Sequence, residues 1–131
     1  MYKRDDIRVK VDIQLENGIY VFLPYSATGK TYLKKQLEYC RGLGDNVVAY
    51  TYSDLKRGLS LQASIDALGA NPNVIMLDRY DLYSTKFWDI INKYAKESII
   101  LLECKNDSVI DDLDYDYADI ELAKDKITVT C

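Results

Sequence analysis

The chain has 131 residues, a mass of 15.1 kDa and 48% hydrophobic residues, which fits one compact domain spanning residues 1–131. Seventeen Lys and Arg against twenty-one Asp and Glu give a net charge of −4, which argues against generic nucleic-acid binding because phosphates attract clustered positive charge. The sequence contains no histidine, which excludes Ser-His-Asp and Cys-His hydrolases and His-ligated zinc.

Two strands are expected first along the chain. Apolar and polar residues alternate between Val9 and Leu15, the period-2 pattern of a half-buried strand. Asn17-Gly18 follows and readily forms a tight turn, and Ile19–Leu23 is apolar throughout, as in a strand covered on both faces. The sequence therefore predicts an N-terminal hairpin over Val9–Leu23 that leads into a central strand.

Helices and strands then alternate, which is typical of βαβ units and a mostly parallel sheet. The expected elements are a helix at Lys30–Arg41, a strand at Asn46–Tyr52, a helix at Ser60–Leu68, a strand at Val74–Leu77, a helix capped by Ser84 with an apolar stripe over Phe87–Tyr94, and a strand at Ile99–Leu102. Two further strands, Tyr117–Leu122 and Ile127–Val129, form a C-terminal hairpin near Lys124-Asp125. The acidic cluster at Asp111–Asp119 is either a metal or partner site or a set of solvated charges, and solvation is the simpler account.

The stretch that carries chemistry lies between the apolar strand and the first helix. It reads Pro24-Tyr25-Ser26-Ala27-Thr28-Gly29-Lys30-Thr31. The first N–H groups of a helix lack intrahelical partners and can bind an anion, and Gly29 lets the backbone approach it closely. Lys30 adds a charge for terminal phosphates, and the Thr31 hydroxyl can bind Mg²⁺.

This stretch resembles the Walker A motif of P-loop nucleoside triphosphatases, G-x-x-x-x-G-K-[ST], with Pro24 in place of the first Gly. Val74–Asp78 is similar to the Walker B motif, four apolar residues ending in Asp. The resemblance implies an α/β three-layer sandwich with a mostly parallel central sheet, here with N-terminal and C-terminal β-hairpins. It implies ATP and Mg²⁺ as cofactors, with Thr31 and Asp78 holding the metal. The nucleotide-binding residues would be Tyr25, Ser26, Ala27, Thr28, Gly29, Lys30 and Thr31.

Hydrolysis needs a further group that orients the attacking water. Many ATPases carry Glu directly after the Walker B Asp, whereas this chain has Arg79, and Asp81 is the nearest substitute. Lys105 or Asn106 follows the strand at Ile99–Leu102, where related proteins place a γ-phosphate sensor, although a polar exit from a buried strand explains the pair equally well. The guanine-reading Asn-Lys-x-Asp motif is missing, which favours ATP.

These observations predict an ATP-binding protein with weak or partner-dependent ATPase or switch activity, the partner being another protein or a second copy. One alternative is a degenerate P-loop fold that acts as a non-catalytic interaction module, and a weaker one is a small-molecule phosphotransferase. The sequence has no apolar run of about 20 residues, and its charged start lacks the apolar stretch of a signal peptide. With Cys40, Cys104 and Cys131 odd in number and far apart, a cytoplasmic protein without membrane segments is expected.

Overall fold

A computed structural model describes residues 1–22, 29–82, 87–105 and 114–131. The elements in these ranges are β1 (Tyr2–Arg4), β2 (Lys10–Ile13), β3 (Gly18–Phe22), α1 (Lys30–Gly42), β4 (Val47–Tyr50), α2 (Tyr52–Lys56), α3 (Leu61–Asp66), β5 (Val74–Leu77), the 3-10 turn η1 (Tyr80–Leu82), α4 (Trp88–Tyr94), β6 (Ile99–Leu102), β7 (Asp116–Ala123) and β8 (Lys126–Thr130). No helix in this part of the chain is both long enough and apolar enough to cross a membrane.

Within the described ranges, eight strands form one mixed sheet in the order β1-β2-β8-β7-β3-β6-β5-β4. The strands from β7 to β4 run parallel to their neighbours, with β3 between β7 and β6. On the other side, β2 pairs parallel with β8, whereas β1 with β2 and β7 with β8 are antiparallel pairs. The parallel strands therefore end at one edge of the sheet, where α/β proteins bind ligands.

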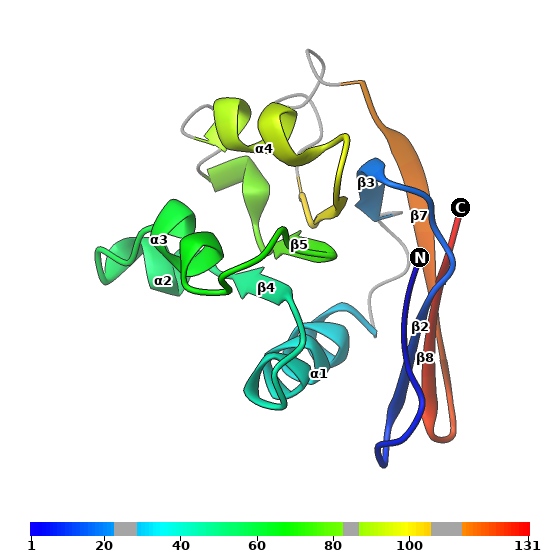
Figure 1. Ribbon diagram of the computed structural model, residues 1–131. Coiled ribbons are helices and arrows are strands. Elements are labelled where there is room, and N and C mark those ends of the chain that lie inside the picture. Colours follow the sequence, from blue (N-terminus) through cyan, green and yellow to red (C-terminus); the bar gives the residue numbers. More distant parts are fainter. Residues whose placement is uncertain (23–28, 83–86, 106–113) are drawn as a thin grey trace.

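Two cores lie on opposite faces of the parallel strands, because successive side chains of a strand point to opposite faces. Ile19 and Val21 of β3 join the core under α3 and α4, while Tyr20 and Phe22 face the core that contains α1. The α1 core also includes buried residues from the other end of the sheet, namely Val11, Ile13, Ile127 and Val129. Strands from both ends of the sheet thus share a core with α1, whose outer face stays exposed (Figure 1).

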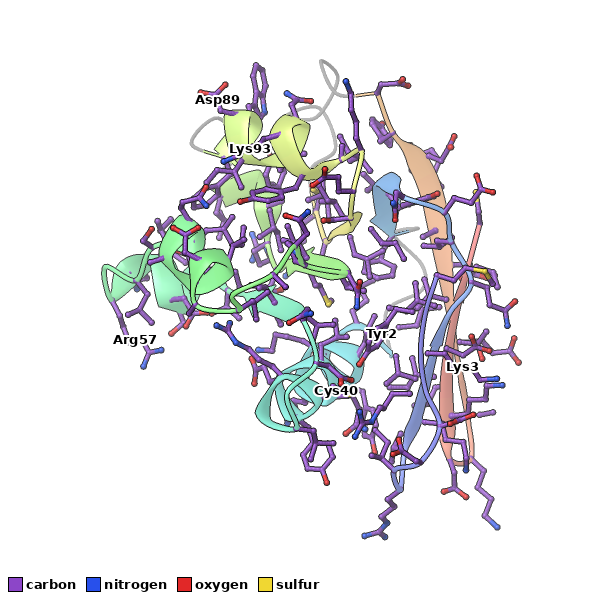
Figure 2. The ribbon with its side chains drawn as sticks, in the orientation of Figure 1. Tyr2, Lys3, Cys40, Arg57, Asp89 and Lys93 are labelled. Carbon is purple, nitrogen blue, oxygen red and sulfur yellow. The ribbon has the colours of Figure 1, made fainter. Side chains whose placement is uncertain are left out.

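The N-terminal strand is fastened to the C-terminal end of α1. The Tyr2 hydroxyl donates a 2.6 Å hydrogen bond to Asp45, and Arg4 makes a 2.9 Å ion pair with the same carboxylate. Figure 2 shows Tyr2 pointing from β1 toward Cys40 of α1. These contacts hold the sheet edge against the helix.

The expected three-layer sandwich with a mostly parallel central sheet is wrong, whereas the expected C-terminal hairpin is confirmed as the antiparallel pair of β7 and β8. The protein instead has a mixed sheet curled into a half-barrel, with few and short helices in the described ranges. The difference lies on the α1 side of the sheet, where buried residues of β2 and β8 share one core with the buried residues Leu33, Leu37 and Cys40 of α1. Buried Ile13 and Val129 favour this curl, because it brings their apolar surface into the core that contains α1.

The N-terminal hairpin over Val9–Leu23 is wrong as well. Its two strands are present as β2 and β3, but they lie apart in the sheet, since β8 and β7 separate them. The apolar Ile19–Phe22 segment requires cover on both faces and takes a central position, whereas β2 pairs with β1 and β8. The expected strand at Asn46–Tyr52 ends at Tyr50, because a capping box between Thr51 and Asp54 starts α2.

Candidate functional site

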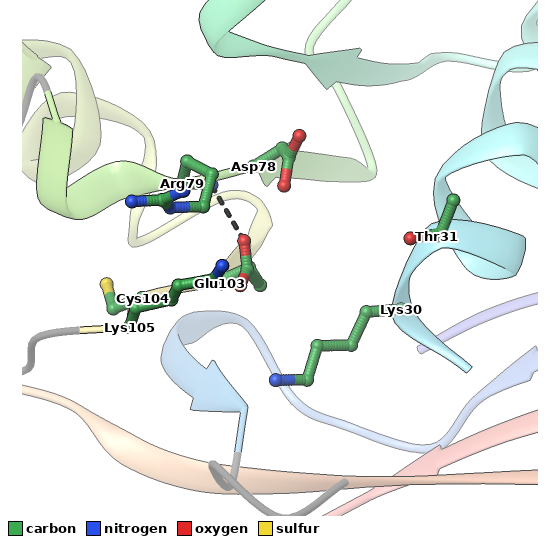
Figure 3. A pocket seen from close by; sticks show the side chains of 7 residues that line it. All are labelled: Lys30, Thr31, Asp78, Arg79, Glu103, Cys104 and Lys105. Atoms are coloured by element: carbon green, nitrogen blue, oxygen red, sulfur yellow. Dashed lines mark hydrogen bonds between the residues drawn. The ribbon is translucent and has the colours of Figure 1, made fainter. Parts of the chain in front are cut away.

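An open pocket of about 430 Å³ lies where the first turn of α1 faces the carboxyl ends of β5 and β6 (Figure 3). Its lining residues are polar or charged with the exception of one thiol. They are Lys30, Thr31, Asp78, Arg79, Glu103, Cys104 and Lys105. The pocket therefore suits a charged ligand better than an apolar one.

Lys30 and Thr31 enter the pocket from the start of α1. Gly29 is the N-cap and supplies no side-chain acceptor, and the first turn carries no acidic residue. The partial positive charge of the helix N-terminus is therefore not compensated by the helix itself. Gly29 also allows close packing, since a Cβ built there would lie 2.9 Å from Cδ1 of Ile120 on β7.

Asp78 and Glu103 enter the pocket from two neighbouring strands. Leu77 pairs with Leu102 in register, so the residues that follow them leave the sheet side by side. Backbone hydrogen bonds extend the pairing, with the Glu103 N–H donating to Leu77 at 3.0 Å and the Tyr80 N–H donating to Glu103 at 2.8 Å. The pairing of β5 with β6 thus sets the backbone positions of both residues.

The turn after β5 orients Glu103. Arg79 has a φ of 53°, the left-handed conformation that non-glycine residues rarely adopt. Its backbone N–H donates a 2.9 Å hydrogen bond to Oε2 of Glu103 (Figure 3). The Arg79 guanidinium binds Asp81 through two hydrogen bonds of 3.2 Å each. The backbone strain at Arg79 therefore places a donor on the pocket carboxylate.

The electrostatics of the pocket centre on Glu103, whose side chain is nearly buried. Burial raises the pKa of the Glu103 carboxyl, and its hydrogen bond with Asp78 raises that pKa further. The Arg79 N–H and the charge of Lys30 oppose this effect. Two facing carboxyl groups need a proton or a cation near them, so the pocket favours a positive charge between Asp78 and Glu103.

The oxygen donors of the pocket fit a hard divalent cation. Thr31 offers a hydroxyl and Asp78 and Glu103 offer carboxylates, which are ligand types that Mg²⁺ prefers. The described residues include no group of three or more His, Cys, Asp or Glu that could hold a metal by itself. Such a cation would therefore need further oxygens from water or a phosphate, as is usual for Mg²⁺.

The structure brings four of the sequence-predicted residues together, since Lys30, Thr31, Asp78 and Lys105 line one pocket. Gly29 lies directly before them as the N-cap. Asp81 lies in η1, where it pairs with Arg79 and does not line this pocket. The predicted residues Tyr25, Ser26, Ala27, Thr28 and Asn106 lie outside the described residues.

Glu103 is the pocket residue that the sequence interpretation missed. A signal for it exists, because Glu103 follows the apolar strand Ile99–Leu102 in the way that Asp78 follows Val74–Leu77. Comparisons with protein-family models, with curated proteins and with solved structures give no match to this chain. The geometry of the pocket is therefore the basis for assigning a function.

Proposed function

We propose that the protein binds Mg²⁺–ATP in this pocket. One observation carries the proposal, namely that Lys30 and Thr31 at the start of a helix share a pocket with Asp78 and Glu103 at the ends of two strands. A polyphosphate needs a cation, free N–H groups and a metal held by oxygens, and these residues offer all three. The Walker-like motifs in the sequence give Lys30, Thr31 and Asp78 the same roles.

Each residue has a distinct role in this proposal. Lys30 and Lys105 carry positive charge for the terminal phosphates, and the N-terminus of α1 adds its partial charge. Thr31 and Asp78 would hold Mg²⁺ together with phosphate oxygens, and the ion would neutralise developing charge on the phosphates. Figure 3 shows Thr31 and Asp78 facing the open part of the pocket from opposite sides.

We further propose that any ATPase activity is weak or depends on a partner. Glu103 takes the water-orienting role that the sequence analysis gave to Asp81, because the Asp81 carboxylate is engaged by Arg79. The same ion pair occupies the one arginine that lines the described pocket. A second protein or a second copy would supply the missing positive charge, which can raise rates by about 10³ to 10⁵.

The proposed setting is the cytoplasm. None of the three cysteines forms a disulfide, and Cys40 and Cys104 are buried whereas Cys131 is exposed. Free thiols are typical of a reducing compartment, where Mg²⁺ and ATP are also available.

Thermal unfolding with and without Mg²⁺–ATP tests the binding proposal. A ligand at a hundred times its Kd adds about 2.7 kcal/mol of stability, which raises Tm by about 10 °C for a chain of this size. Lys30→Ala is expected to abolish this rise, whereas Lys35→Ala, an exposed lysine on the same helix, is expected to retain it. Equal rises in wild type and Lys30→Ala would contradict the proposal.

A further inference from the structure

A second hollow of about 600 Å³ lies between the outer face of α1 and the rim of the half-barrel. Its volume is within the usual range for small-molecule sites, about 300 to 1,000 Å³. The residues that line it come from α1, from the segment before β2 and from the β7–β8 turn: Arg8, Val9, Tyr32, Gln36, Tyr39, Lys124 and Asp125. We call this hollow the α1 groove.

The α1 groove and the phosphate pocket are lined by neighbouring residues of α1. Thr31 lines the pocket and Tyr32, the next residue, lines the groove. Side chains of a helix generally lean toward its N-terminus, which is the end of α1 that carries the pocket residues Lys30 and Thr31. Ile120 packs against Gly29, which brings the arm formed by β7 and β8 alongside the start of the helix (Figure 1). A ligand that starts at Lys30 can therefore continue along α1 into the groove.

The groove offers a flat ring beside hydrogen-bonding groups. Tyr32 is 41% exposed and lies away from the buried helix face formed by Leu33 and Leu37. Gln36 donates a 2.8 Å hydrogen bond from Nε2 to the Val9 carbonyl, which fixes its amide and leaves Oε1 as an acceptor. A half-exposed aromatic ring stacks on any nucleobase, and fixed acceptors bind its amino groups or ribose hydroxyls.

The charged residues that line the α1 groove also fit a nucleoside. Arg8 and Lys124 can approach the phosphate nearest the ribose, and the Asp125 carboxylate can accept from sugar hydroxyls. This combination of ring, acceptors and cations matches the nucleoside end of a nucleotide better than a purely anionic ligand. We propose that the α1 groove holds the base and ribose of the bound nucleotide, with Tyr32 stacking on the base. This inference rests on the proposed nucleotide function of the adjoining pocket.

Calorimetric titration with two ligands tests the groove separately from the pocket. Mg²⁺–ATP has phosphates and a nucleoside, whereas Mg²⁺–tripolyphosphate has only the phosphates. We expect wild type to bind ATP at least about tenfold more tightly than tripolyphosphate, because stacking on an aromatic side chain has this order of effect. Tyr32→Ala should remove most of the difference and leave tripolyphosphate binding unchanged. Tyr32→Phe should keep the difference, because the ring remains.

The matched control is Tyr117→Ala, which removes a 44% exposed tyrosine on β7 that does not line the groove. It should bind both ligands as wild type does. The groove proposal is overturned if wild type binds the two ligands equally, if Tyr32→Ala with Gln36→Ala keeps the wild-type ratio, or if Tyr32→Ala weakens both ligands alike. Failure of wild type to bind either ligand would instead refute the pocket proposal, and the groove assignment would fall with it.

Discussion

Glu103→Gln is expected to stabilise the ligand-free protein at neutral pH. Glutamine keeps the size of the side chain and can still accept the 2.9 Å hydrogen bond from the Arg79 N–H, while it removes a charge facing Asp78. Two charges about 4 Å apart repel by about 1 kcal/mol in water and about 4 kcal/mol at an effective dielectric constant of about 20. Because Lys30 offsets part of this repulsion, we expect a gain of about 1 kcal/mol.

The pH dependence of this gain has a definite sign. Because the folded pKa of Glu103 is raised, its carboxyl contributes stability below the unfolded pKa of about 4.3 that is lost as pH rises through the folded value. Glutamine resembles the protonated carboxyl group, so the Glu103→Gln variant keeps this stability as the pH rises. Urea unfolding of wild type and Glu103→Gln should therefore give equal stability near pH 4 and a growing advantage for the variant toward pH 8.

Two further measurements complete the test of the Glu103→Gln prediction. Glu97→Gln, which removes an exposed carboxylate, is the control for a change in net charge and should show little pH-dependent difference. With saturating Mg²⁺–ATP the order should reverse, because the cation would stabilise two carboxylates better than one. A variant that is less stable than wild type at pH 8 without ligand, or a difference independent of pH, would refute the reasoning.

Three other predictions follow from contacts near the site and in the half-barrel. Gly29→Ala places a methyl group 2.9 Å from Ile120 and should cost about 1 to 3 kcal/mol in urea unfolding, partly restored by Ile120→Val; an unchanged stability would contradict the close packing. The Gln14 amide holds the pKa of Asp12 below its usual value, so Asp12 contributes stability above its unfolded pKa of about 3.9 that falls away in acid. Asp12→Asn should reduce this loss of stability in acid, and an equal loss in wild type and variant would refute the prediction. Asp81→Asn should change phosphate release little, because Asp81 binds Arg79 and does not line the pocket; a large loss would show a direct role.

Local elements were predictable from the sequence because their signals are local. The apolar runs Val74–Leu77 and Ile99–Leu102 are β5 and β6 with the predicted bounds, and the stripe of Leu33, Leu37 and Cys40 marks α1. Their assembly was not predictable in the same way. The separation of β2 from β3 and the curl around α1 depend on contacts between the two ends of the chain, which periodicity does not encode.

The candidate site was likewise predictable only where its residues belong to local sequence motifs. Lys30, Thr31 and Asp78 were found because each belongs to a motif of contiguous residues, and the structure brings them to one pocket. Glu103 was missed because its significance comes from the pairing of β5 with β6, which sets it beside Asp78. The hydrogen bond from the Arg79 backbone N–H to Glu103 could not be predicted either, since a left-handed φ at a non-glycine residue has no sequence signal.

A crystal structure of the protein with Mg²⁺ and a non-hydrolysable ATP analogue tests the central claim most directly. We expect phosphates against Lys30 and the N-terminus of α1, with one Mg²⁺ between the Thr31 hydroxyl and Asp78, directly or through water. Glu103 should lie on the side of the terminal phosphate. Density for the nucleotide elsewhere on the molecule, with this pocket holding only solvent at saturating ligand, would contradict the account.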